Sequence, residues 1–596
     1  MTLADWIGSD ATRFPFLNEL DPDYWTKATR NADAAISAFG LDPSKPREAL
    51  DKPPGFKSVA KFPTPNPQQK AVGALDLEAR LTILESETGS GKTEAALWRF
   101  AQLFHAGKVD ALYFAVPTRA AAVQLHRRTC DAVLRLFGDN APQAVLAAPG
   151  YLRAGAVDGT PLPGWRTRWD DGDEEGRHSA RWAAERSNRY LAALIAVGTV
   201  DQAMLGALKV KYAHLRASSL SRALMVIDEV HASDAFMTEV QRRLLDAHIK
   251  VGGYAMLMSA TLGSAARSKW LRRPQPNAEE AIATPYPAIW TDRMDQPIEI
   301  AQNPRAEIDP KSSKSVRMET LSTMSGEETA RHALKAANDG ARVLVIRNTV
   351  ASAVETYKAV DAECGDQSML LEVKGVRTLH HSRFAPTDRR LLDQAVEETL
   401  SNNADKKRRG RIVIGTQTLE QSLDIDADFL LTDLCPIDVL LQRIGRLHRH
   451  DLTRPKGFKT PRCMVMTPEN GLDALVDPPR FENGLGGWVD ANMIGGVYLD
   501  LPIVELTRRL IDAHQVWEIP TMNRRLVESA THPERVRALI DEKGPSWDAY
   551  QRAVVGKDLA SLSGAKAQTI DRTRPFSELV YPSEEEKIRT RLGAEG

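Results

Sequence analysis

Residues 86–93 form a Gly-rich loop that limits the possible folds more than any other part of the sequence. The loop follows an apolar run at 81–84 and precedes a helical pattern at 93–104. In this context main-chain N–H groups can face phosphate oxygens at a helix N-terminus. We therefore expect Lys92 to reach the β- and γ-phosphates of ATP and Thr93 to hold Mg²⁺. The predicted loop contacts are Ser86, Glu87, Thr88, Gly89, Ser90, Gly91, Lys92 and Thr93.

Short apolar runs recur along the chain in two blocks. Runs of this length that end in turn or polar signals are typical of strands buried on both faces of a parallel sheet. Helical patterns alternate with them, which predicts an α/β fold. The first block has runs at 81–84, 111–116, 194–197, 224–227 and 254–258, with helices at 93–104 and 118–136. The second has runs at 343–346, 370–373, 411–414 and 429–432, with helices at 350–360 and 388–400.

These blocks suggest a division of the chain into two α/β domains and several smaller parts. A Pro- and charge-rich stretch separates the blocks, and a Gly- and Pro-rich stretch follows the second. The C-terminal tail alternates helical runs with polar turns, and we expect its Trp547 and Tyr550 to fill a small core rather than to stack on bases. The expected boundaries are 1–60, 61–265 (first α/β domain), 266–320 (linker), 321–470 (second α/β domain), 471–500 (linker) and 501–596 (helical domain).

Composition narrows the class of protein only a little. Lys plus Arg number 78 and Asp plus Glu number 79, so whole-chain charge neither implies nor excludes a nucleic-acid partner. The four cysteines are far apart, which argues against a zinc knuckle or a disulfide framework. The sequence has no signal-peptide pattern and no apolar run of membrane-spanning length. We expect a soluble, cytoplasmic protein without a membrane partner.

Asp228 and Glu229 follow the apolar strand at 225–227. Acids at the carboxyl end of a parallel strand lie at the crevice where α/β folds bind nucleotides. Asp228 is suited to holding Mg²⁺, and Glu229 to orienting and deprotonating the attacking water. The alternative is a helix N-terminus that favours acidic residues through its dipole.

Arg446 and Arg449 are three residues apart, which would place them on one helical face. Two guanidinium groups at that spacing can clamp a transferring γ-phosphoryl group from across a cleft. A solvated basic helix face, or one that contacts DNA phosphates, is the alternative. Their place in the second block favours the clamp, because a closing partner domain would supply it.

The order of these elements resembles that of superfamily 2 helicases, whose fold is two tandem RecA-like domains. Asn66-Pro67-Gln68-Gln69 resembles the adenine-reading Q motif, and residues 415–424 resemble motif V. By this resemblance Gln69, Asp424 and Gln442 join the ATP site. Ser259, Thr261 and His231 would couple nucleotide state to DNA, although His231 could equally make a structural hydrogen bond. The implied DNA contacts are Pro117, Thr118, Arg119, Thr199, Gln202, Asn348, Thr349 and Thr416.

Narrower features resemble the CRISPR-associated helicase–nuclease family of type I interference. They are residues 198–203, 228–237 and 381–384, and the resemblance runs from about residue 60 onward. It implies an ATP-dependent translocase that moves 3′ to 5′ on single-stranded DNA. It also implies recruitment by an RNA-guided surveillance complex that has opened an R-loop.

The N-terminal segment resembles only the end of the HD nuclease domain that usually precedes this helicase. Asp5 matches the family's last acidic metal ligand, and the only His-Asp dipeptide is His450-Asp451, in the arginine region. One carboxylate cannot hold a metal site. We therefore expect no autonomous nuclease on this sequence, and either a separate HD nuclease polypeptide or a truncated reading of a longer gene.

Two other functions stay open: an RNA helicase of the same superfamily, and a scaffold for the guide complex without turnover. The basic run at 406–411 could touch DNA phosphates, but we favour a solvated turn. His380 and His381 have no acidic partner at ligand spacing, so we interpret them as part of the family motif rather than as metal ligands.

Overall fold

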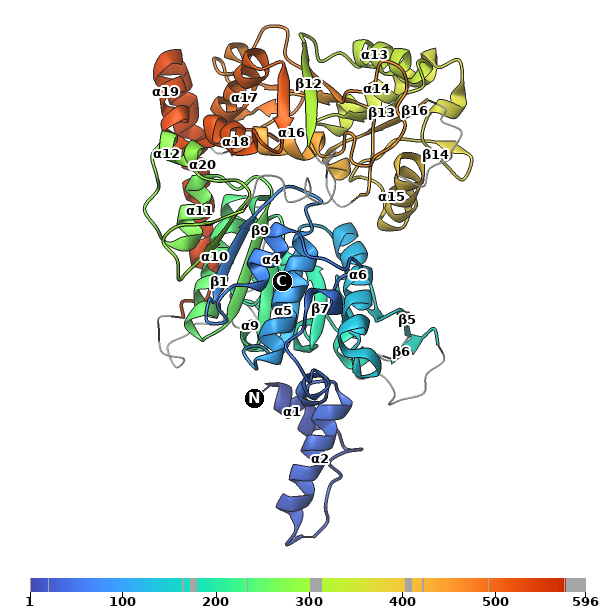
Figure 1. Ribbon diagram of the computed structural model, residues 1–596, viewed down its shortest axis with the longest axis vertical. Coiled ribbons are helices and arrows are strands. Elements are labelled where there is room, and N and C mark those ends of the chain that lie inside the picture. The colour runs from blue at the N-terminus through green and yellow to red at the C-terminus, as the bar shows by residue number, and fades with distance from the viewer. Residues whose placement is uncertain are drawn as a thin grey trace.

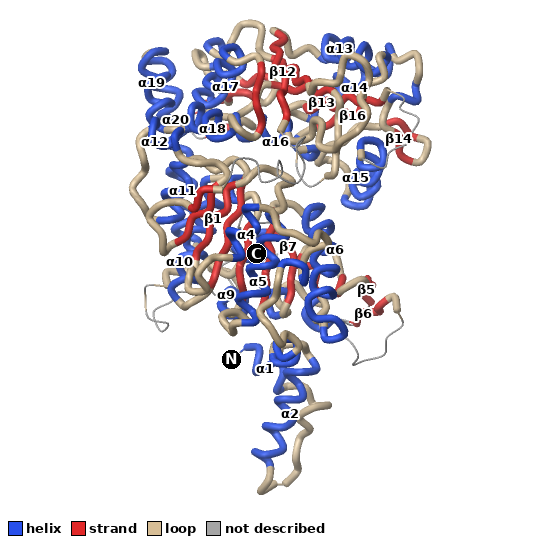
Figure 2. Tube along the Cα trace, in the orientation of Figure 1, coloured by secondary structure: helices blue, strands red, loops and turns tan. Residues whose placement is uncertain are grey.

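The computed structural model describes residues 2–574, apart from residues 20, 163–165, 172–179, 233, 301–312, 402–409, 421–422, 491–492 and 573. Two α/β bodies lie one above the other, and a helical N-terminal segment projects from the lower one (Figure 1). Each body has a central sheet with helices around it (Figure 2). This is the α/β fold with two RecA-like domains and a helical C-terminal region that the sequence predicts.

The first body is built on a sheet whose six central strands are parallel. These strands are, in spatial order, β1 (Leu81–Glu85), β9 (Tyr254–Ser259), β8 (Ala223–Ile227), β2 (Ala111–Val116), β7 (Ile195–Thr199) and β3 (Ala144–Ala147). All five apolar runs predicted for this block are strands. Antiparallel strands flank them: β10 (Ala288–Thr291) and β11 (Ile298–Glu299) on one side, and β4 (Arg153–Ala154), β5 (Val157–Leu162) and β6 (Arg166–Trp169) on the other.

Both faces of this sheet are buried, which explains the continuous apolar runs. Along β1, Leu84 packs with α5 (Lys92–His105) and α6 (Arg119–Phe137). Its neighbour Ile83 packs on the opposite face with α10 (Ala235–Lys250). Successive apolar residues of a strand therefore alternate between two hydrophobic clusters, one on each face of the sheet.

The second body has a six-stranded sheet of which five strands are parallel. The order is β16 (Arg411–Gly415), β13 (Arg342–Ile346), β17 (Phe429–Asp433), β18 (Arg462–Met466), β12 (Lys314–Leu321) and antiparallel β23 (Val516–Ile519). The helices around it include α13 (Gly326–Asn338), α14 (Val350–Glu363), α15 (Pro386–Leu400) and α16 (Ile437–Ile444).

The predicted core strand at 370–373 is wrong. Glu372–Val373 (β14) instead pairs with Val376–Arg377 (β15) in a separate hairpin, and Leu370 makes only a single bridge to Ile412. Lys374 and Gly375 both have positive φ, 50° and 81°, which is the geometry of a tight two-residue hairpin turn.

The two stretches expected to be linkers contain regular structure. The first holds α11 (Ser264–Leu271), α12 (Ala278–Ala283), β10, β11 and most of β12. The second holds short hairpins: β19 (Phe481–Glu482) with β20 (Leu485–Gly486), and β21 (Trp488–Asp490) with β22 (Met493–Gly495).

The C-terminal segment contacts both bodies. It contains α17 (Leu501–Ala513), β23, α18 (Asn523–Thr531), α19 (Pro533–Lys543) and α20 (Pro545–Gln568). β23 joins the second sheet, whereas α20 packs on α10 and the N–H of Lys209 donates to the Gln568 carbonyl over 2.8 Å. Trp547 and Tyr550 are each 3% exposed in the second body's core, which confirms their predicted place. The helices α6 and α15 lie on the opposite side of the interface from the C-terminal helices (Figure 1). There Gln124 of α6 donates a hydrogen bond to Glu397 of α15.

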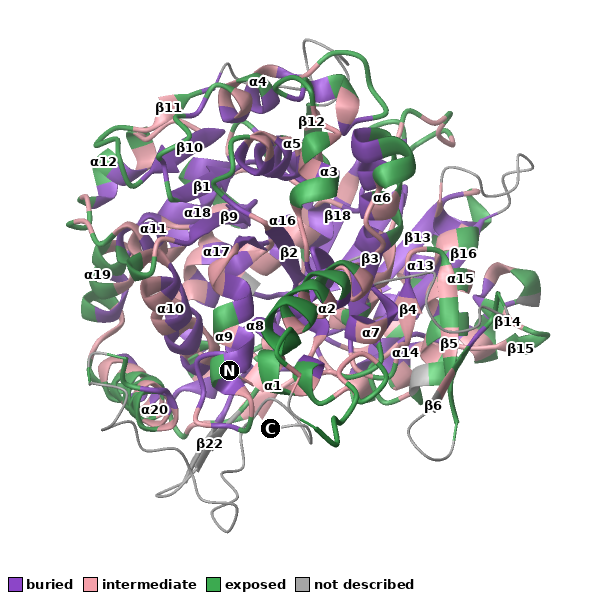
Figure 3. Ribbon diagram, turned by 90° about the horizontal axis from the view of Figure 1, so that it is seen from below, coloured by how far each residue is buried: buried purple, intermediate pink, exposed green. Residues whose placement is uncertain are grey.

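The N-terminal segment packs through α1 (Thr2–Gly8), while α2 (Tyr24–Ala38) extends away with mostly exposed side chains (Figure 3). Ile7 and Ala35 form a small cluster with Ala192. Asp5 is exposed. Among the helices described, none has the length and hydropathy that crossing a bilayer requires.

Candidate functional site

The predicted phosphate loop connects β1 to α5. Gly89 and Gly91 have φ of 82° and 89°, conformations that favour glycine, and the Ser86 hydroxyl donates to Ser90 Oγ over 2.8 Å. Lys92 is the first residue of α5 and is 6% exposed. Its Nζ donates to the Ser86 carbonyl over 2.9 Å. Thr93 is also buried. The loop therefore holds Lys92 and Thr93 at a helix N-terminus, as the sequence predicts.

Gln69 supports this loop from α4 (Pro67–Gly73). Its Oε1 accepts from the Asn66 N–H over 2.9 Å, and its Nε2 donates to the Gly91 carbonyl over 3.1 Å. Asn66 Nδ2 donates to the Ser90 carbonyl over 2.8 Å. Both ends of the Gln69 amide thus have main-chain partners, and its predicted contact with adenine stays a prediction.

Replacing Gly91 with Ala is expected to weaken nucleotide binding by about tenfold or more, since strain of this kind costs about 1–3 kcal/mol. A Cβ at residue 91 would lie 2.4 Å from Gln69 Nε2, at a φ of +89°. Titration with a fluorescent ADP analogue and Mg²⁺ measures the effect. Gly107→Ala is the matched control, because Gly107 has a φ of +67° but no atom within 4 Å of a built Cβ. Equal affinities for wild type and Gly91→Ala would contradict the expectation.

Asp228 and Glu229 directly follow β8, and Glu229 has a φ of 51°. Glu229 Oε1 lies 3.9 Å from Lys92 Nζ, and Oε2 lies 3.5 Å from His231 Nδ1. Burial, and then the neighbouring Glu229, raise the pKa of Asp228 to about 7. Burial alone would raise the pKa of Glu229 too, but Lys92, His231 and Arg446 outweigh it and lower that pKa. Glu229 is therefore ionised at neutral pH, as a general base must be.

Asp228 and Thr93 are suited to holding a divalent cation. Carboxylate and hydroxyl oxygens are ligands that Mg²⁺ prefers, and Asp228 and Thr93 supply them. The raised pKa of Asp228 means that its negative charge is poorly compensated by the protein alone. A bound cation would provide that compensation, so these residues fit Mg²⁺.

A line of hydrogen bonds crosses from the first body to the second beside this pair. Ser259, at the end of β9, bonds His231 Nδ1 through Oγ over 2.7 Å and accepts from the Thr261 N–H over 3.2 Å. The other His231 ring nitrogen bonds Gln442 of α16. His231 therefore makes a structural hydrogen bond and also connects the two bodies, and its coupling of nucleotide state to DNA stays a prediction.

The arginine pair does not lie on a helix, which corrects the prediction. The helix α16 ends at Ile444, and Ala427 bridges Leu447 just beyond it. Arg446 is buried and donates to the carbonyls of Glu420 (2.6 Å) and Leu423 (2.7 Å).

Both arginines still lie near the interface, since Arg449 lines the cavity between the bodies and the charge of Arg446 acts on Glu229. Burial, with Arg449 beside it, lowers the pKa of Arg446 to about 9, although the charge of Glu229 acts in the other direction. Arg449 Nε lies 3.3 Å from Asp424 Oδ1. The predicted Asp424 thus binds an arginine of its own body.

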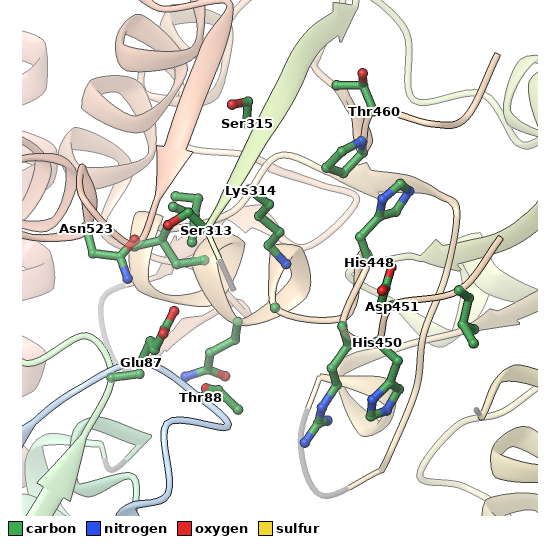
Figure 4. Close-up of a pocket in the computed structure, with 18 of the residues that line it drawn as sticks. Glu87, Thr88, Ser313, Lys314, Ser315, His448, His450, Asp451, Thr460 and Asn523 are labelled. Atoms are coloured by element: carbon green, nitrogen blue, oxygen red, sulfur yellow. The ribbon is translucent and has the colours of Figure 1, made fainter. Parts of the chain in front are cut away.

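A cavity of about 390 Å³ separates the phosphate loop from the second body (Figure 4). Glu87 and Thr88 line it from the first body, and Gln442, Arg449 and His448 from the second. Lys314, at the start of β12, also lines it and donates to the carbonyls of Ile444 (2.8 Å) and Leu447 (2.6 Å). Burial lowers the pKa of Lys314 to about 8.

Two of the predicted DNA contacts occupy equivalent places in the two bodies. Thr118 follows β2 and caps α6, accepting from the Ala121 N–H over 3.2 Å. Thr349 follows β13 and caps α14, accepting from the Ser352 N–H over 3.1 Å. Each helix N-terminus is suited to a phosphate of a nucleic-acid backbone.

The other predicted DNA contacts vary in exposure. Arg119 is exposed and Pro117 is half-buried, whereas Thr199, Gln202 and Thr416 are buried. Asn348 is only 1% exposed. Its Nδ2 donates to the Leu434 carbonyl and its Oδ1 accepts from Arg443. In this conformation the Asn348 side chain belongs to the core of the second body and is not available to DNA.

Sequence reasoning missed the buried ion pairs around Asn348. Arg347 pairs with Asp433, both 0% exposed, at 2.9 Å, and Arg443 donates to Glu420 Oε1 over 2.8 Å. A charged residue directly after an apolar run was the available signal for Arg347 and for Asp433.

His380 also has an acidic partner that its sequence neighbourhood does not reveal. Its Nε2 bonds Asp393 Oδ1 over 2.6 Å, and its Nδ1 bonds Thr418 Oγ1 over 2.7 Å. His380 thus ties α15 to the predicted motif V.

Some predictions lie outside the described residues, namely 406–409 of the basic run and 421–422 of motif V. Within the described ranges, no group of three or more His, Cys, Asp and Glu side chains is arranged to hold a metal ion.

The family model and the curated relatives that match this chain are Cas3 proteins. A family model described as "CRISPR-associated nuclease/helicase Cas3, C-terminal" matches residues 339–452. The CRISPR-associated endonuclease/helicase Cas3 of Escherichia coli (strain K12) is 31% identical over 487 residues, which cover 78% of this chain and 52% of that protein. The chain spans about half the length of the curated relatives it matches first.

Solved structures show the same fold. The crystal structure of T. fusca Cas3 with ATP matches with a TM-score of 0.72 and 23% identity, over 96% of this chain and 63% of that one. A chain in a structure entitled "CRISPR RNA-guided surveillance complex, pre-nicking" matches with a TM-score of 0.63 and 22% identity, over 96% and 60%.

Proposed function

The chain belongs to the Cas3 helicase family, and from that premise we propose that it hydrolyses ATP to move along single-stranded DNA and unwind a target. One observation carries the proposal: Lys92, Glu229 and the His231–Gln442 hydrogen bond lie together where the two bodies meet. A nucleotide that changes contacts at this place can change how the bodies sit relative to each other.

Each site residue has a role in this proposal. Lys92 binds the β- and γ-phosphates from the first body, and Arg446 and Arg449 stabilise developing charge from the second. Glu229 orients the attacking water and takes its proton. Thr93 and Asp228 would hold Mg²⁺, which neutralises phosphate charge when bound. Gln442 and His231 pass the state of the site between the bodies.

The proposed partners follow from the family and from two helix N-termini. Thr118 and Thr349 cap helices that would bind DNA phosphates, so the grip on DNA is expected to tolerate any sequence. The match to a chain of a surveillance complex supports recruitment by such a complex.

ATP hydrolysis with and without circular single-stranded DNA tests the proposal. The DNA is examined for cleavage in the same tube, with Mg²⁺ and a transition metal present. DNA-stimulated turnover with intact DNA supports a helicase without its own nuclease, and cleavage would overturn that part. Stronger activation by single-stranded RNA would favour an RNA helicase, and no turnover would favour the scaffold.

Gln442→Ala is expected to lower the stimulation of ATP turnover by DNA about tenfold, because the substitution breaks the contact with His231. The ratio of turnover with DNA to turnover without DNA measures this effect. Gln394→Ala is the control, since Gln394 bonds only Glu398 on the exposed face of α15 among the contacts described. An unchanged stimulation ratio in Gln442→Ala would show that the bridge does not carry the coupling.

A further inference from the structure

Glu85 is a fully buried carboxylate at the last position of β1, directly before the phosphate loop. Its charge is balanced partly from the C-terminal segment. Arg524 of α18 donates to both oxygens, Nη1 to Oε1 over 3.2 Å and Nη2 to Oε2 over 2.8 Å. Arg267 of α11 donates to Oε1 over 3.0 Å, and the Trp290 indole N–H donates to Oε2 over 2.7 Å.

The two-pronged contact fixes the direction of α18 as well as its distance from β1. An arginine that meets both oxygens of a carboxylate has a defined orientation, unlike a lysine. Burial would raise the pKa of Glu85, but Arg524 and Arg267 outweigh it and hold that pKa at about 2. The pair is therefore charged across the range in which the protein would work.

A second contact of α18 lies three residues beyond Thr261. Glu528 accepts from the Ser264 N–H and from the Ser264 hydroxyl, both over 2.7 Å. Arg524 also donates to the Leu262 carbonyl over 3.3 Å. The helix α18 thus contacts the last residue of β1 and the segment that follows β9. The next residue after β1, Ser86, donates its N–H to the carbonyl of Ser259 at the end of β9.

The other side of α18 faces the second body. It packs against α16, which carries Gln442, and against α17. Leu526, Val527 and Ala530 belong to the second body's hydrophobic cluster. One short helix therefore contacts the strand that leads into the phosphate loop and the helix α16, which lines the same cavity as that loop.

We infer that Arg524 is a positioning residue of the nucleotide site: through its fork on Glu85 it sets the phosphate loop relative to α16 from the C-terminal segment. The inference rests on the proposed function, since it concerns the same site. It assigns to the C-terminal segment a part in binding nucleotide, although no residue of α18 touches the phosphate loop in the contacts described.

Arg524→Met tests the inference by removing the charge while keeping most of the side-chain length. The readout is the dissociation constant of a fluorescent ADP analogue with Mg²⁺, alongside kcat and KM for ATP, on the full chain. A change that only reduced the folded fraction would lower kcat and leave the dissociation constant and KM unmoved. Mispositioning is expected to weaken nucleotide binding by about tenfold.

Glu534→Ala is the matched control. Glu534 accepts from the Ala278 N–H over 2.9 Å, so it is another contact between the C-terminal segment and the first body, distant from β1 in sequence. Its dissociation constant is expected to stay within about twofold of wild type. The double variant Glu85→Gln, Arg524→Met is expected to bind no more weakly than the weaker single variant, because both act through one contact.

A folded Arg524→Met with wild-type affinity and KM would overturn the inference. If that variant does not fold, Arg524→Lys decides, since lysine keeps the charge but cannot make the fork. An affinity below that of wild type supports the inference, and wild-type affinity overturns it. A wild-type protein that binds no nucleotide would instead contradict the proposed function itself.

Discussion

Glu229→Gln is expected to reduce ATP turnover by about 10²–10⁴-fold while leaving nucleotide binding nearly unchanged. Glutamine has the shape of the carboxylate but cannot take a proton from water. The pair of distances at Glu229, 3.9 Å to Lys92 and 3.5 Å to His231, shows a carboxylate held between a cation and an imidazole. Its lowered pKa leaves it ionised and ready to accept the proton.

Two assays separate the chemical step from binding. Phosphate release measures turnover, and titration with a fluorescent ATP analogue measures affinity. Glu94→Gln is the control, because Glu94 follows Thr93 on α5 but pairs with Arg128 at 2.6 Å. Lys92→Ala should lose turnover together with nucleotide affinity, in contrast to Glu229→Gln. Normal turnover in Glu229→Gln would remove Glu229 from the mechanism.

Arg347→Met is expected to destabilise the second body by about 3–5 kcal/mol, because it leaves the charge of Asp433 buried without its arginine. Both side chains are 0% exposed, and Arg347 Nε donates to the two Asp433 oxygens over 2.9 and 3.0 Å. Arg347 Nη2 also donates to the Met324 carbonyl over 2.6 Å. The free energy of unfolding in urea measures the loss.

Arg331→Met is the matched control in the same body. Arg331 pairs with Glu328 on the surface of α13 at 2.7 Å, and a pair of that kind contributes at most about 1 kcal/mol. Similar unfolding free energies for the two variants would mean that the buried pair gives the second body no more stability than a surface pair does.

The sequence predicted the parts of the fold that depend on local pattern. Strands such as β1 and β2 are buried on both faces, so each appears as an unbroken apolar run. β12 has no apolar run that would predict it. Exposed and buried positions alternate along much of this strand, and its sequence includes Lys314, Arg317 and Glu319. β14 was mistaken for a core strand because an apolar run does not reveal where its hydrogen-bond partners lie.

The candidate site divides in the same way. Local sequence patterns mark four of its residues. A Gly-rich loop precedes Lys92 and Thr93, and an apolar strand precedes Asp228 and Glu229. Arg524 could not be predicted, since it meets Glu85 across 439 positions of sequence and no local feature marks either residue. The end of α16 at Ile444, before Arg446, depends likewise on contacts that the following residues make with Glu420, Leu423 and Ala427.

The C-terminal segment limits how the two bodies can move relative to each other. It is attached to the second sheet by β23 and to the first body by α18 and α20. The two bodies are therefore connected twice, by the chain that runs between them and by the C-terminal segment. A straight separation would have to break the buried fork between Arg524 and Glu85. A swing about a hinge axis through α18 leaves that fork intact, and its displacement grows with distance from the axis. The opposite rim, where Gln124 meets Glu397, is therefore the first place to part.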